Sequence, residues 1–576
     1  MRGRALAVAA PVAALALAIG FFLLKTRQLA GGLGVEAFPL DDAWIHMQFA
    51  RNLAEGRGFS YNPGVPVSGS TAPLWTLALG GAFAVLGSHP VLAKVLGIAA
   101  TLGSAWLAGR LALIWAGRRD LALLASVLVV LAGPMVWGAL SGMEVTLAAF
   151  LVTAALVLHA RGRAWAAGAA LGLAAVARPE AALLPPLFWL AGPLTARRVP
   201  AWGLPVAGFL APWVAFNLAT TGSPLPATAA AKIDGGLVGY LAGVREPLRT
   251  TLLERPWQFE TEWARWLWRV DVLLPILLLP GLWWLGRHAG RAALVPASVL
   301  VLHPLAMAIL APYRAPSFQE GRYSIHLLPL ALVVAVVPLT PLFSSSTSPL
   351  SPSGGEGRVR GLRWVRGLRW VRGLRWVRGV RWVRGLRWVR GRLGWIASAA
   401  LLIGAVAALP SAASRYGWAV QNTEAMQVHL GHWVARHTPP TARIGLNDVG
   451  AIAYISRREV VDVMGLVTPA IIPFRRAGEM GVLRYLEHAC PDYLIVFPAW
   501  FPAISEMADR FHPGYRVRLD HNEVAGADEL VVYETVWSRW RPDRRPCPGA
   551  LARGPGTSRE TPAEMRGDRI IATRHP

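Results

Sequence analysis

The sequence predicts a polytopic α-helical membrane protein that ends in a small α/β domain outside the membrane. Hydrophobic residues make up 54% of its 576 residues and charged residues only 16%, whereas an average soluble protein has about 25% charged residues. Long apolar runs, typical of membrane helices, recur until about residue 410. Beyond that point the sequence has short runs typical of strands, at 442–446, 459–463, 493–497 and 530–533.

The first apolar run, residues 5–24, sets the expected orientation. It approaches bilayer length and no small-residue cleavage site follows it, so an uncleaved span is favoured over a signal peptide. Arg2 and Arg4 place its start in the cytoplasm, and the loop at 25–71 is then outside. Counting onward gives about eleven spans within a membrane domain of residues 1–410, a short hairpin included.

The apolar run at 71–87 is shorter than a typical spanning helix. If it crosses the membrane, Arg118 and Arg119 lie outside, and if it packs at the interface they lie inside. Positive-inside counting favours the interface.

The formal net charge of +25 does not indicate a nucleic-acid partner, because about half of it comes from one segment. Residues 358–392 repeat a six-residue unit with 13 arginines and no acid, a period too short for a solenoid. A tandem expansion within a cytoplasmic loop at 344–392 accounts for it. The alternative is a segment that rests on an anionic membrane face.

Residues 411–537 are expected to form an α/β domain on the outer side, followed by a disordered Pro/Arg-rich tail at 538–576. The two cysteines, Cys490 and Cys547, make neither a disulfide framework nor a metal site. They can pair only if this region is extracytoplasmic, and the place of Cys547 in the tail argues against pairing.

Two adjacent carboxylates, Asp41 and Asp42, follow the first span and are the leading site candidates, because polar residues beside membrane spans are often functional. Residues 42–54 have helical spacing, so either aspartate can cap this helix. A cap needs only one carboxylate, which leaves the second to act as a general base or to hold a metal. The alternative is that both only cap the helix.

The predicted topology brings all the acidic or mixed polar motifs to one outer face, while the strongly basic loops are cytoplasmic. These motifs are Asp41-Asp42, Glu144, Arg178 with Glu180, Lys232, and Arg322 with Tyr323. His46 is interpreted as a polar-face residue, because no second His or Cys stands at metal-ligand spacing.

The ordered set of motifs resembles the GT-C superfamily of membrane glycosyltransferases, and within it the bacterial arabinofuranosyltransferase-like branch. The resemblance covers most of residues 1–535. Two positions depart from the usual pattern, with Trp44 in place of tyrosine and a Ser-Gly-Ser turn at 68–70, so the sugar is not assigned. The pieces that carry it are Asp41-Asp42-Ala43-Trp44-Ile45, Tyr61-Asn62-Pro63-Gly64, Ser141-Gly142-Met143-Glu144, Arg178-Pro179-Glu180, Asn217, Lys232, Gly321-Arg322-Tyr323, Asp448-Val449-Gly450 and Asp462.

The resemblance implies an inverting enzyme that moves a sugar from a polyprenyl-phosphate donor to a glycan, lipid or protein acceptor on the outer face. Asp42 or Asp41 would be the base, and Glu144 an acidic residue near the acceptor or a cation. The implied donor-phosphate ligands are Arg178, Lys232 and Arg322, and the implied supporting residues are Arg51, Tyr61, Asn62, Glu180 and Tyr323. This scheme assigns no cofactor with certainty, and a divalent cation is compatible with the carboxylates.

Simpler roles stand beside these. Arg178 and Glu180 can pair to stabilise the hairpin, Arg322 and Tyr323 can anchor a helix at the interface, Glu144 can cap the next helix, and Lys232 can be solvated. Asp448 and Asp462 are interpreted as turn residues of the outer domain, which is expected to help bind a glycan acceptor.

Two rival functions remain. A flippase for lipid-linked sugars would show repeated halves, and none is evident. A non-catalytic scaffold for envelope assembly would not need the aspartate pair. The expected location is a bacterial inner membrane.

Overall fold

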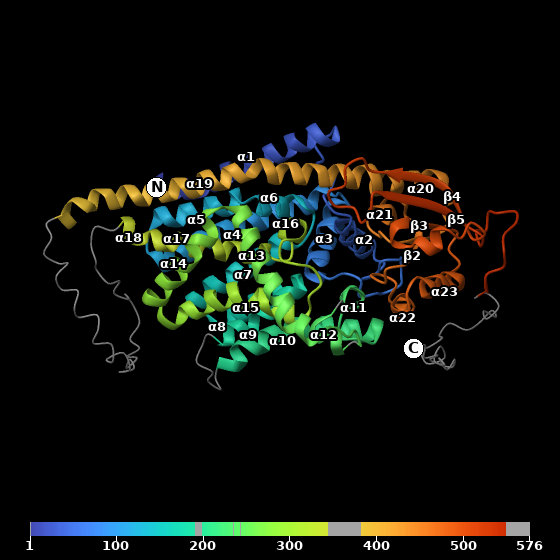
Figure 1. Ribbon diagram of the computed structural model, residues 1–576, viewed down its shortest axis with the longest axis horizontal. Coiled ribbons are helices and arrows are strands. Elements are labelled where there is room, and N and C mark those ends of the chain that lie inside the picture. Colours follow the sequence, from blue (N-terminus) through green and yellow to red (C-terminus); the bar gives the residue numbers. More distant parts are fainter. Residues whose placement is uncertain (1, 191–197, 234, 242, 344–381, 549–576) are drawn as a thin grey trace. The chain divides into compact units, whose positions relative to one another are not determined.

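The computed structural model describes residues 2–190, 198–233, 235–241, 243–343 and 382–548 (Figure 1). The chain divides into two compact units. The helical unit comprises Met1–Lys25, Ala93–Ala211 and Asp234–Ser414, and the mixed unit comprises Thr26–Leu92, Pro212–Ile233 and Arg415–Pro576. Most of the arginine repeat falls outside the described residues.

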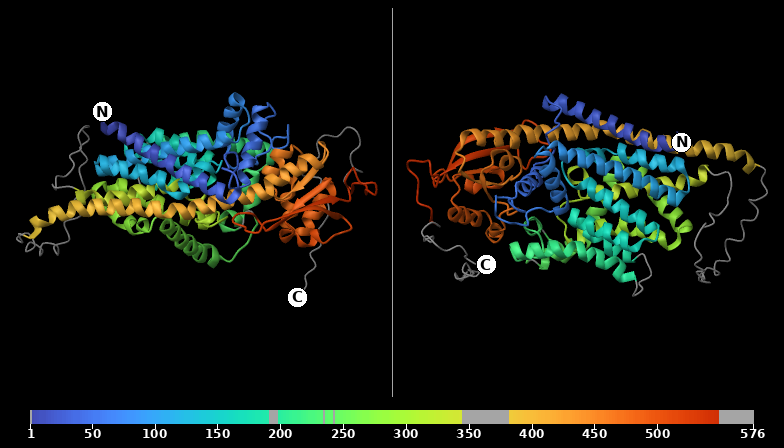
Figure 2. Two further views of the ribbon diagram at one scale, coloured as in Figure 1. Left: turned by 90° about the horizontal axis from the view of Figure 1, so that it is seen from above. Right: turned by 180° about the vertical axis from the view of Figure 1, so that it is seen from behind.

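The helical unit is built from apolar helices joined by short turns, as the hydrophobic runs predict (Figure 2). Some of these helices continue into the mixed unit. They are α1 (Arg2–Ala30), α4 (Val91–Ala116), α5 (Arg119–Leu131), α6 (Gly133–Leu140), α7 (Val145–Ala160), α8 (Ala164–Ala177), α9 (Leu184–Leu190), α10 (Arg198–Thr221), α12 (Gly236–Leu241), α13 (Arg255–Val270), α14 (Leu273–His288), α15 (Leu294–Leu310), α16 (Phe318–Gly321), α17 (Leu328–Val336), α18 (Thr340–Phe343) and α19 (Trp382–Thr423).

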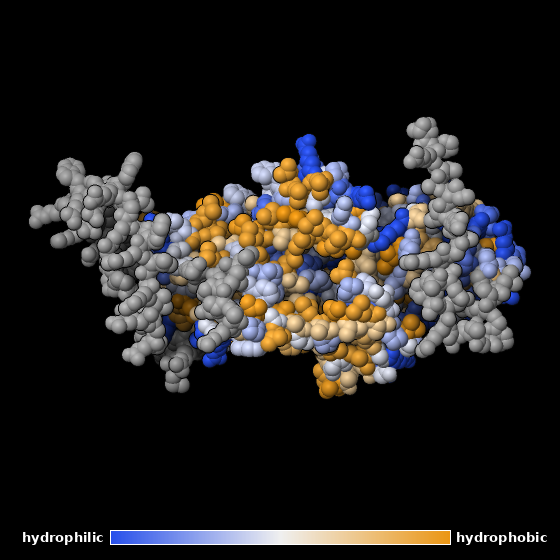
Figure 3. Space-filling model, turned by 90° about the horizontal axis from the view of Figure 1, so that it is seen from below, coloured by the Kyte–Doolittle hydropathy of each residue, from blue (hydrophilic) through white to orange (hydrophobic). Residues whose placement is uncertain are grey.

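Five helices in the described part of the chain are long and apolar enough to cross a membrane, and two bent pairs raise the number to seven if each is one span. Four shorter apolar helices accompany them. Helix α17 is buried along its whole length, whereas only 11% of the apolar window of α10 is buried. Figure 3 shows apolar residues gathered over the helical part of the face it displays. The membrane-protein class is confirmed, and the span number of about eleven stays a prediction.

The mixed unit contains a five-stranded sheet in the order β2-β1-β3-β5-β4. Strand β1 pairs in parallel with both β2 and β3, whereas β5 pairs antiparallel with both β3 and β4. The sequence patterns predict four of them, and the fifth, β4, has mixed exposure as befits an edge strand. The strands are β1 (Arg443–Leu446), β2 (Glu459–Asp462), β3 (Tyr493–Val496), β4 (Phe511–Arg518) and β5 (Glu529–Thr535); the helices around them are α20 (His429–His437), α21 (Ala451–Ser456), α22 (Ile472–Arg476), α23 (Glu479–Ala489) and α24 (Pro502–Ser505).

The segment that the sequence predicts as the first outer loop shares one hydrophobic core with this sheet. It contributes α2 (Asp42–Ala54) and α3 (Pro73–Leu86). Ile45, Phe49 and Tyr61 are buried in one cluster with strand and helix residues such as Ile444 and Ile452. The loop was expected to belong to the membrane domain, and it instead folds with the C-terminal domain in one unit. Its apolar periodicity serves that core as well as it would serve a membrane surface.

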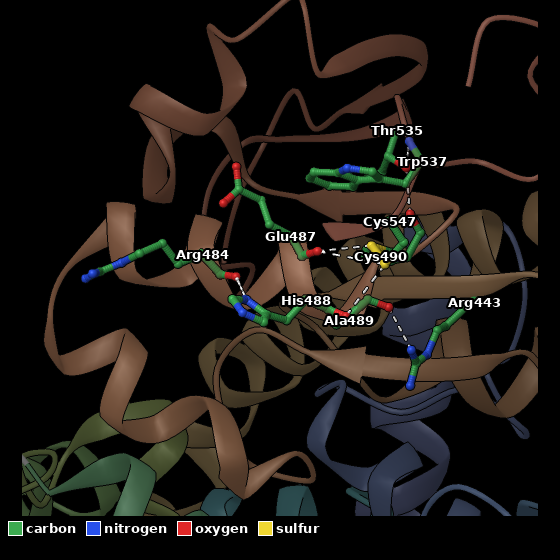
Figure 4. Close-up of a disulfide and its surroundings, with 10 residues drawn as sticks. Arg443, Arg484, Glu487, His488, Ala489, Cys490, Thr535, Trp537 and Cys547 are labelled. Atoms are coloured by element: carbon green, nitrogen blue, oxygen red, sulfur yellow. Dashed lines mark hydrogen bonds between the residues drawn. A yellow bond between two sulfur atoms is a disulfide. The ribbon is translucent and has the colours of Figure 1, made fainter. Parts of the chain in front are cut away.

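The folded chain continues past residue 537, where the sequence predicts a disordered tail. A disulfide joins Cys490 to Cys547 with a Cα–Cα distance of 5.9 Å (Figure 4). Arg539 makes an ion pair with the buried Asp492, Nη2 to Oδ2, at 2.9 Å. The expectation that the cysteines stay unpaired is therefore wrong, because these contacts bring the segment back along the sheet. Residues 549–576 lie outside the described residues.

Candidate functional site

Asp41 does not cap the helix that follows it. Its side chain makes no capping hydrogen bond to α2. Its two carboxylate oxygens instead accept hydrogen bonds from the backbone N–H groups of Gly450 and Ala451, each at 2.7 Å. Asp41 therefore caps α21, which lies more than 400 residues later in the chain. A carboxylate at this position satisfies donors that a helix N-terminus leaves unpaired.

The close approach of Asp41 depends on glycine at position 450. A Cβ at Gly450 would overlap the backbone carbonyl and the carboxylate of Asp41. The Asp448-Val449-Gly450 piece of the sequence thus receives a physical explanation. Its last residue, Gly450, and the following Ala451 provide the two N–H groups that bind Asp41.

Three further residues of the first loop bind the same part of the C-terminal domain. The Arg51 guanidinium donates to the Tyr454 carbonyl at 2.8 Å and lies over its ring at 4.2 Å. The Tyr61 hydroxyl donates to the carbonyl of Val449. Asn62 donates to the Val460 carbonyl at 2.8 Å and accepts from its N–H at 3.0 Å. Arg51, Tyr61 and Asn62 therefore fix the first loop on the C-terminal domain.

Asp42 faces a different partner. Its carboxylate lies 3.9 Å from the Nζ of Lys232, and the two side chains are 32% and 23% exposed. Lys232 ends the short helix α11 (Ala227–Lys232). That helix is tied to the first loop, because the Ala227 N–H donates to the Ser68 carbonyl at 3.0 Å. The predicted acid and one predicted phosphate ligand are thus neighbours at an accessible point.

The carboxylates around Asp42 influence one another. Burial raises the pKa of Asp41, and the charge of Asp448 raises it further. Burial also raises the pKa of Asp448, to which the charge of Asp42 adds, while a hydrogen bond from Gln427 at 2.8 Å lowers it. These shifts favour a proton held within the group. In the described residues no cluster of three or more metal-ligating side chains is present.

Asp462 has the structural role that the sequence predicts. It is fully buried, and its two oxygens accept from the N–H groups of Met464 and Val467, both at 2.7 Å. This arrangement closes the turn after β2. His46 lies against Ser70 and Thr76 and has no metal-like surroundings in the described residues.

A second cluster lies inside the helical unit. Arg178 Nη1 is 2.7 Å from Glu144 Oε1, and its Nε is 3.1 Å from Glu180 Oε2. The pairing of Arg178 with Glu180 is present as the simpler interpretation predicts, but Glu144 joins it from another helix. Glu144 itself makes no side-chain cap on α7. Arg178 and Glu144 are only 4% and 3% exposed, so the cluster is internal.

Arg322 and Tyr323 belong to the same cluster. Arg322 Nη2 donates to the Tyr323 hydroxyl at 3.0 Å, and the guanidiniums of Arg322 and Arg178 lie 5.0 and 5.3 Å from the Tyr323 ring centre. Arg322 is only 5% exposed. The interface-anchor alternative is therefore wrong for this arginine, because an anchor must reach the headgroup region.

Sequence reasoning missed two histidines beside this cluster. His303 Nε2 lies 3.0 Å from the Glu180 carbonyl oxygen, and His326 Nε2 lies 3.3 Å from His303 Nε2. Both side chains are about 1% exposed. Each stands alone in an apolar run, and a lone histidine gives no pairing signal, so only the fold reveals the contact.

Comparisons with known proteins agree with this architecture. Residues 417–541 match a family described as a domain of unknown function, DUF8728. A comparison with curated proteins gives no match. Among solved structures, ArnT from Cupriavidus metallidurans bound to undecaprenyl phosphate is similar with a TM-score of 0.56 and 13% identity, over 91% of this chain and 97% of that one.

The Archaeoglobus fulgidus oligosaccharyltransferase in complex with Zn and sulfate is also similar, with a TM-score of 0.51 and 13% identity, over 92% of this chain and 73% of that one. At such identities the likeness establishes the fold. The chain therefore has the GT-C-like fold that its motifs predict.

Proposed function

We propose that this protein is an inverting membrane glycosyltransferase that takes a sugar from a polyprenyl-phosphate donor and passes it to an acceptor on the outer face of a bacterial inner membrane. The fold supports the class, since the similar ArnT structure holds undecaprenyl phosphate and an Archaeoglobus fulgidus oligosaccharyltransferase structure of TM-score 0.50 and 13% identity is tethered to an acceptor peptide. The observation that carries the proposal is the partly exposed Asp42 carboxylate beside Lys232.

In the proposed step, the Asp42 carboxylate takes the proton of an acceptor hydroxyl. The acceptor oxygen attacks the anomeric carbon, and the bond from that carbon to the phosphate oxygen breaks. Polyprenyl phosphate leaves with the electron pair, and Lys232 balances its charge. A fixed cation at the leaving group lowers the barrier because charge develops there in the transition state, and a general base contributes about 10²–10⁴-fold.

The contacts of each candidate residue decide the role that we assign to it. Asp41 has both oxygens committed to α21, which supports Asp42 as the base. Arg178 is already balanced by two carboxylates, so we assign it to positioning within the helical unit. We assign the donor phosphate to Lys232.

The disulfide supports an outer location for the mixed unit. Disulfides persist in oxidising compartments and are rare in the cytosol, and Cys490 is bonded to Cys547. The cytoplasmic N-terminus that the sequence predicts is compatible with this orientation.

The test is sugar transfer by the full chain in lipid, with a panel of labelled polyprenyl-phosphate sugars and a mixed envelope-glycan extract. Asp42→Asn should lower kcat about 10²-fold or more with an unchanged unfolding transition. Lys232→Gln should weaken transfer, and Lys232→Arg should restore part of it. Asp120→Asn is the matched control, since Asp120 is a partly exposed acid paired with Arg118. If wild type binds polyprenyl phosphate but consumes no donor, the flippase or scaffold function is favoured instead.

A further inference from the structure

Helix α13 has a packed inner face and an outer face rich in tryptophan and arginine. On the inner face, Phe259, Trp263 and Trp266 are buried. On the outer face, Trp257 is 74% exposed and Trp268 is 50% exposed. Exposed tryptophan and arginine on one side of an amphipathic helix are typical of helices that lie in the plane of the membrane interface.

The connection to α14 fits this position. Asp271 has an extended backbone that ends α13, and its carboxylate accepts from the N–H of Leu273 at 2.8 Å at the start of α14. The chain turns by 110° here. Helix α14 exposes Ile276 and Leu279 by 52% and 76%, as expected of a helix in lipid. If α14 crosses the bilayer, a turn of this size leaves α13 close to the membrane plane.

A cavity of about 760 Å³ lies at this corner. One wall carries Arg265 and Arg269, one helical turn apart on the outer face of α13. The acid in the lining, Glu262, accepts a hydrogen bond from Ser317 Oγ at 2.8 Å. The three charged side chains leave the cavity with one net positive charge.

The remaining walls are apolar. Trp268 comes from α13, and Pro275 and Ile276 come from the first turns of α14. The cavity volume falls within the range of about 300–1,000 Å³ found for small-molecule sites. A lining that combines two arginines with apolar side chains matches a molecule whose anionic end is joined to hydrocarbon, whereas a free phosphate would use only the arginines.

We propose that this cavity binds the headgroup of an anionic glycerophospholipid from the surrounding bilayer. Arg265 and Arg269 hold the phosphate, and Pro275 and Ile276 contact the glycerol and the first methylenes. The source is bulk bilayer lipid, because the cavity opens on the exposed surface of α13 and α14. The role is distinct from sugar transfer and does not depend on it.

The test uses the full chain in nanodiscs of phosphatidylcholine with a minor fraction of phosphatidylglycerol, and native mass spectrometry of the lipid it retains. Wild type should retain phosphatidylglycerol in preference. The double variant Arg265→Gln/Arg269→Gln should bind it about 30-fold more weakly, the equivalent of about 2 kcal/mol, because each basic residue at an anionic surface contributes about 1 kcal/mol. Both side chains are exposed, so the fold should be kept.

Two further variants test whether lipid retention depends on this cavity or only on the positive charge of the protein surface. Arg245→Gln/Arg249→Gln removes two other exposed arginines of the helical unit and should leave retention unchanged. Ala264→Phe fills the cavity without altering its charge and should also lower retention. Inorganic phosphate and glycerol phosphate should fail to displace the lipid.

Three results would overturn the proposal. Equal retention of both lipids would exclude charge recognition, and full retention by the Arg265→Gln/Arg269→Gln variant would exclude this cavity. One-for-one displacement by undecaprenyl phosphate would assign the cavity to the donor carrier. The first two results do not bear on sugar transfer, which is measured separately, whereas the third would move the donor-carrier site from Lys232 to this cavity.

Discussion

Removal of the Asp41 carboxylate should loosen the mixed unit at a defined place. In Asp41→Ala the N–H groups of Gly450 and Ala451 lose their acceptors. Both residues are buried, so water has restricted access to replace the lost bonds. The effect should begin at the N-terminus of α21 and extend to the first loop, which Asp41 joins to it.

The magnitude follows from the two orphaned donors. A buried donor without a partner costs about 1–3 kcal/mol, so the pair should cost roughly 2–6 kcal/mol. At 1.4 kcal/mol per tenfold change, even the lower end corresponds to roughly 30-fold easier local opening.

Hydrogen exchange of the full chain in lipid measures this opening directly. The amides of Gly450 and Ala451 should exchange roughly 30-fold faster or more in Asp41→Ala. Gly450→Ala should give the same pattern, because its Cβ would displace the carboxylate. Asp42→Ala is the matched control and should leave these amides unchanged. Unchanged exchange in Asp41→Ala would show that Asp41 does not hold α21 and would reopen its role as the base.

Three further predictions concern stability, each checked by unfolding of the purified protein. Replacing Cys490 and Cys547 by serine should destabilise the mixed unit by about 4 kcal/mol, since their 57-residue separation closes a long loop; an unchanged transition would show the bond is absent in solution. Glu144→Gln should cost about 3 kcal/mol, because it leaves the buried charge of Arg178 with one carboxylate fewer; a neutral result would place water at this cluster. Burial raises the pKa of Asp462 from 3.8 to about 6, so the folded state binds this proton more tightly than the unfolded state. Its contribution is fully present below pH 3.8 and is lost as pH rises through about 6; Asp462→Asn should remove this slope, and a slope that survives would have another source.

The membrane class and most strands could be predicted because their signals are local. Apolar runs depend only on neighbouring residues, and the structure keeps them as apolar helices and as strands that are buried along most of their length. The edge strand β4 (Phe511–Arg518) escaped prediction because its one-sided burial leaves little apolar pattern. The pairing of Cys490 with Cys547 escaped because composition marks the end of the chain as a tail, whereas ion pairs such as that of Arg539 with Asp492 decide its path.

The candidate residues could be named from motifs, but their partners could not. Asp41 and Gly450, or Asn62 and Val460, are separated by about 400 residues, and no periodicity links positions so far apart. Glu144 and Arg178 are only 34 residues apart, but their contact also depends on how α7 and α8 pack. A single sequence shows which residue types could take part in catalysis. The tertiary contacts decide which of these side chains instead have a structural role.

The backbone directs the side chains of the two adjacent aspartates to different partners, so one has a structural role and the other is proposed to act in catalysis. Asp41 has helical backbone angles although it precedes α2, so its side chain and that of Asp42 diverge by about 100° around the helix axis. One direction meets the amides of Gly450 and Ala451, and the other meets Lys232. The Asp41 carboxylate fixes the start of the helix that carries Asp42, so Asp42 is positioned by its neighbour and stays partly accessible. A capping role and a functional role therefore coexist in this pair, each requiring its own carboxylate.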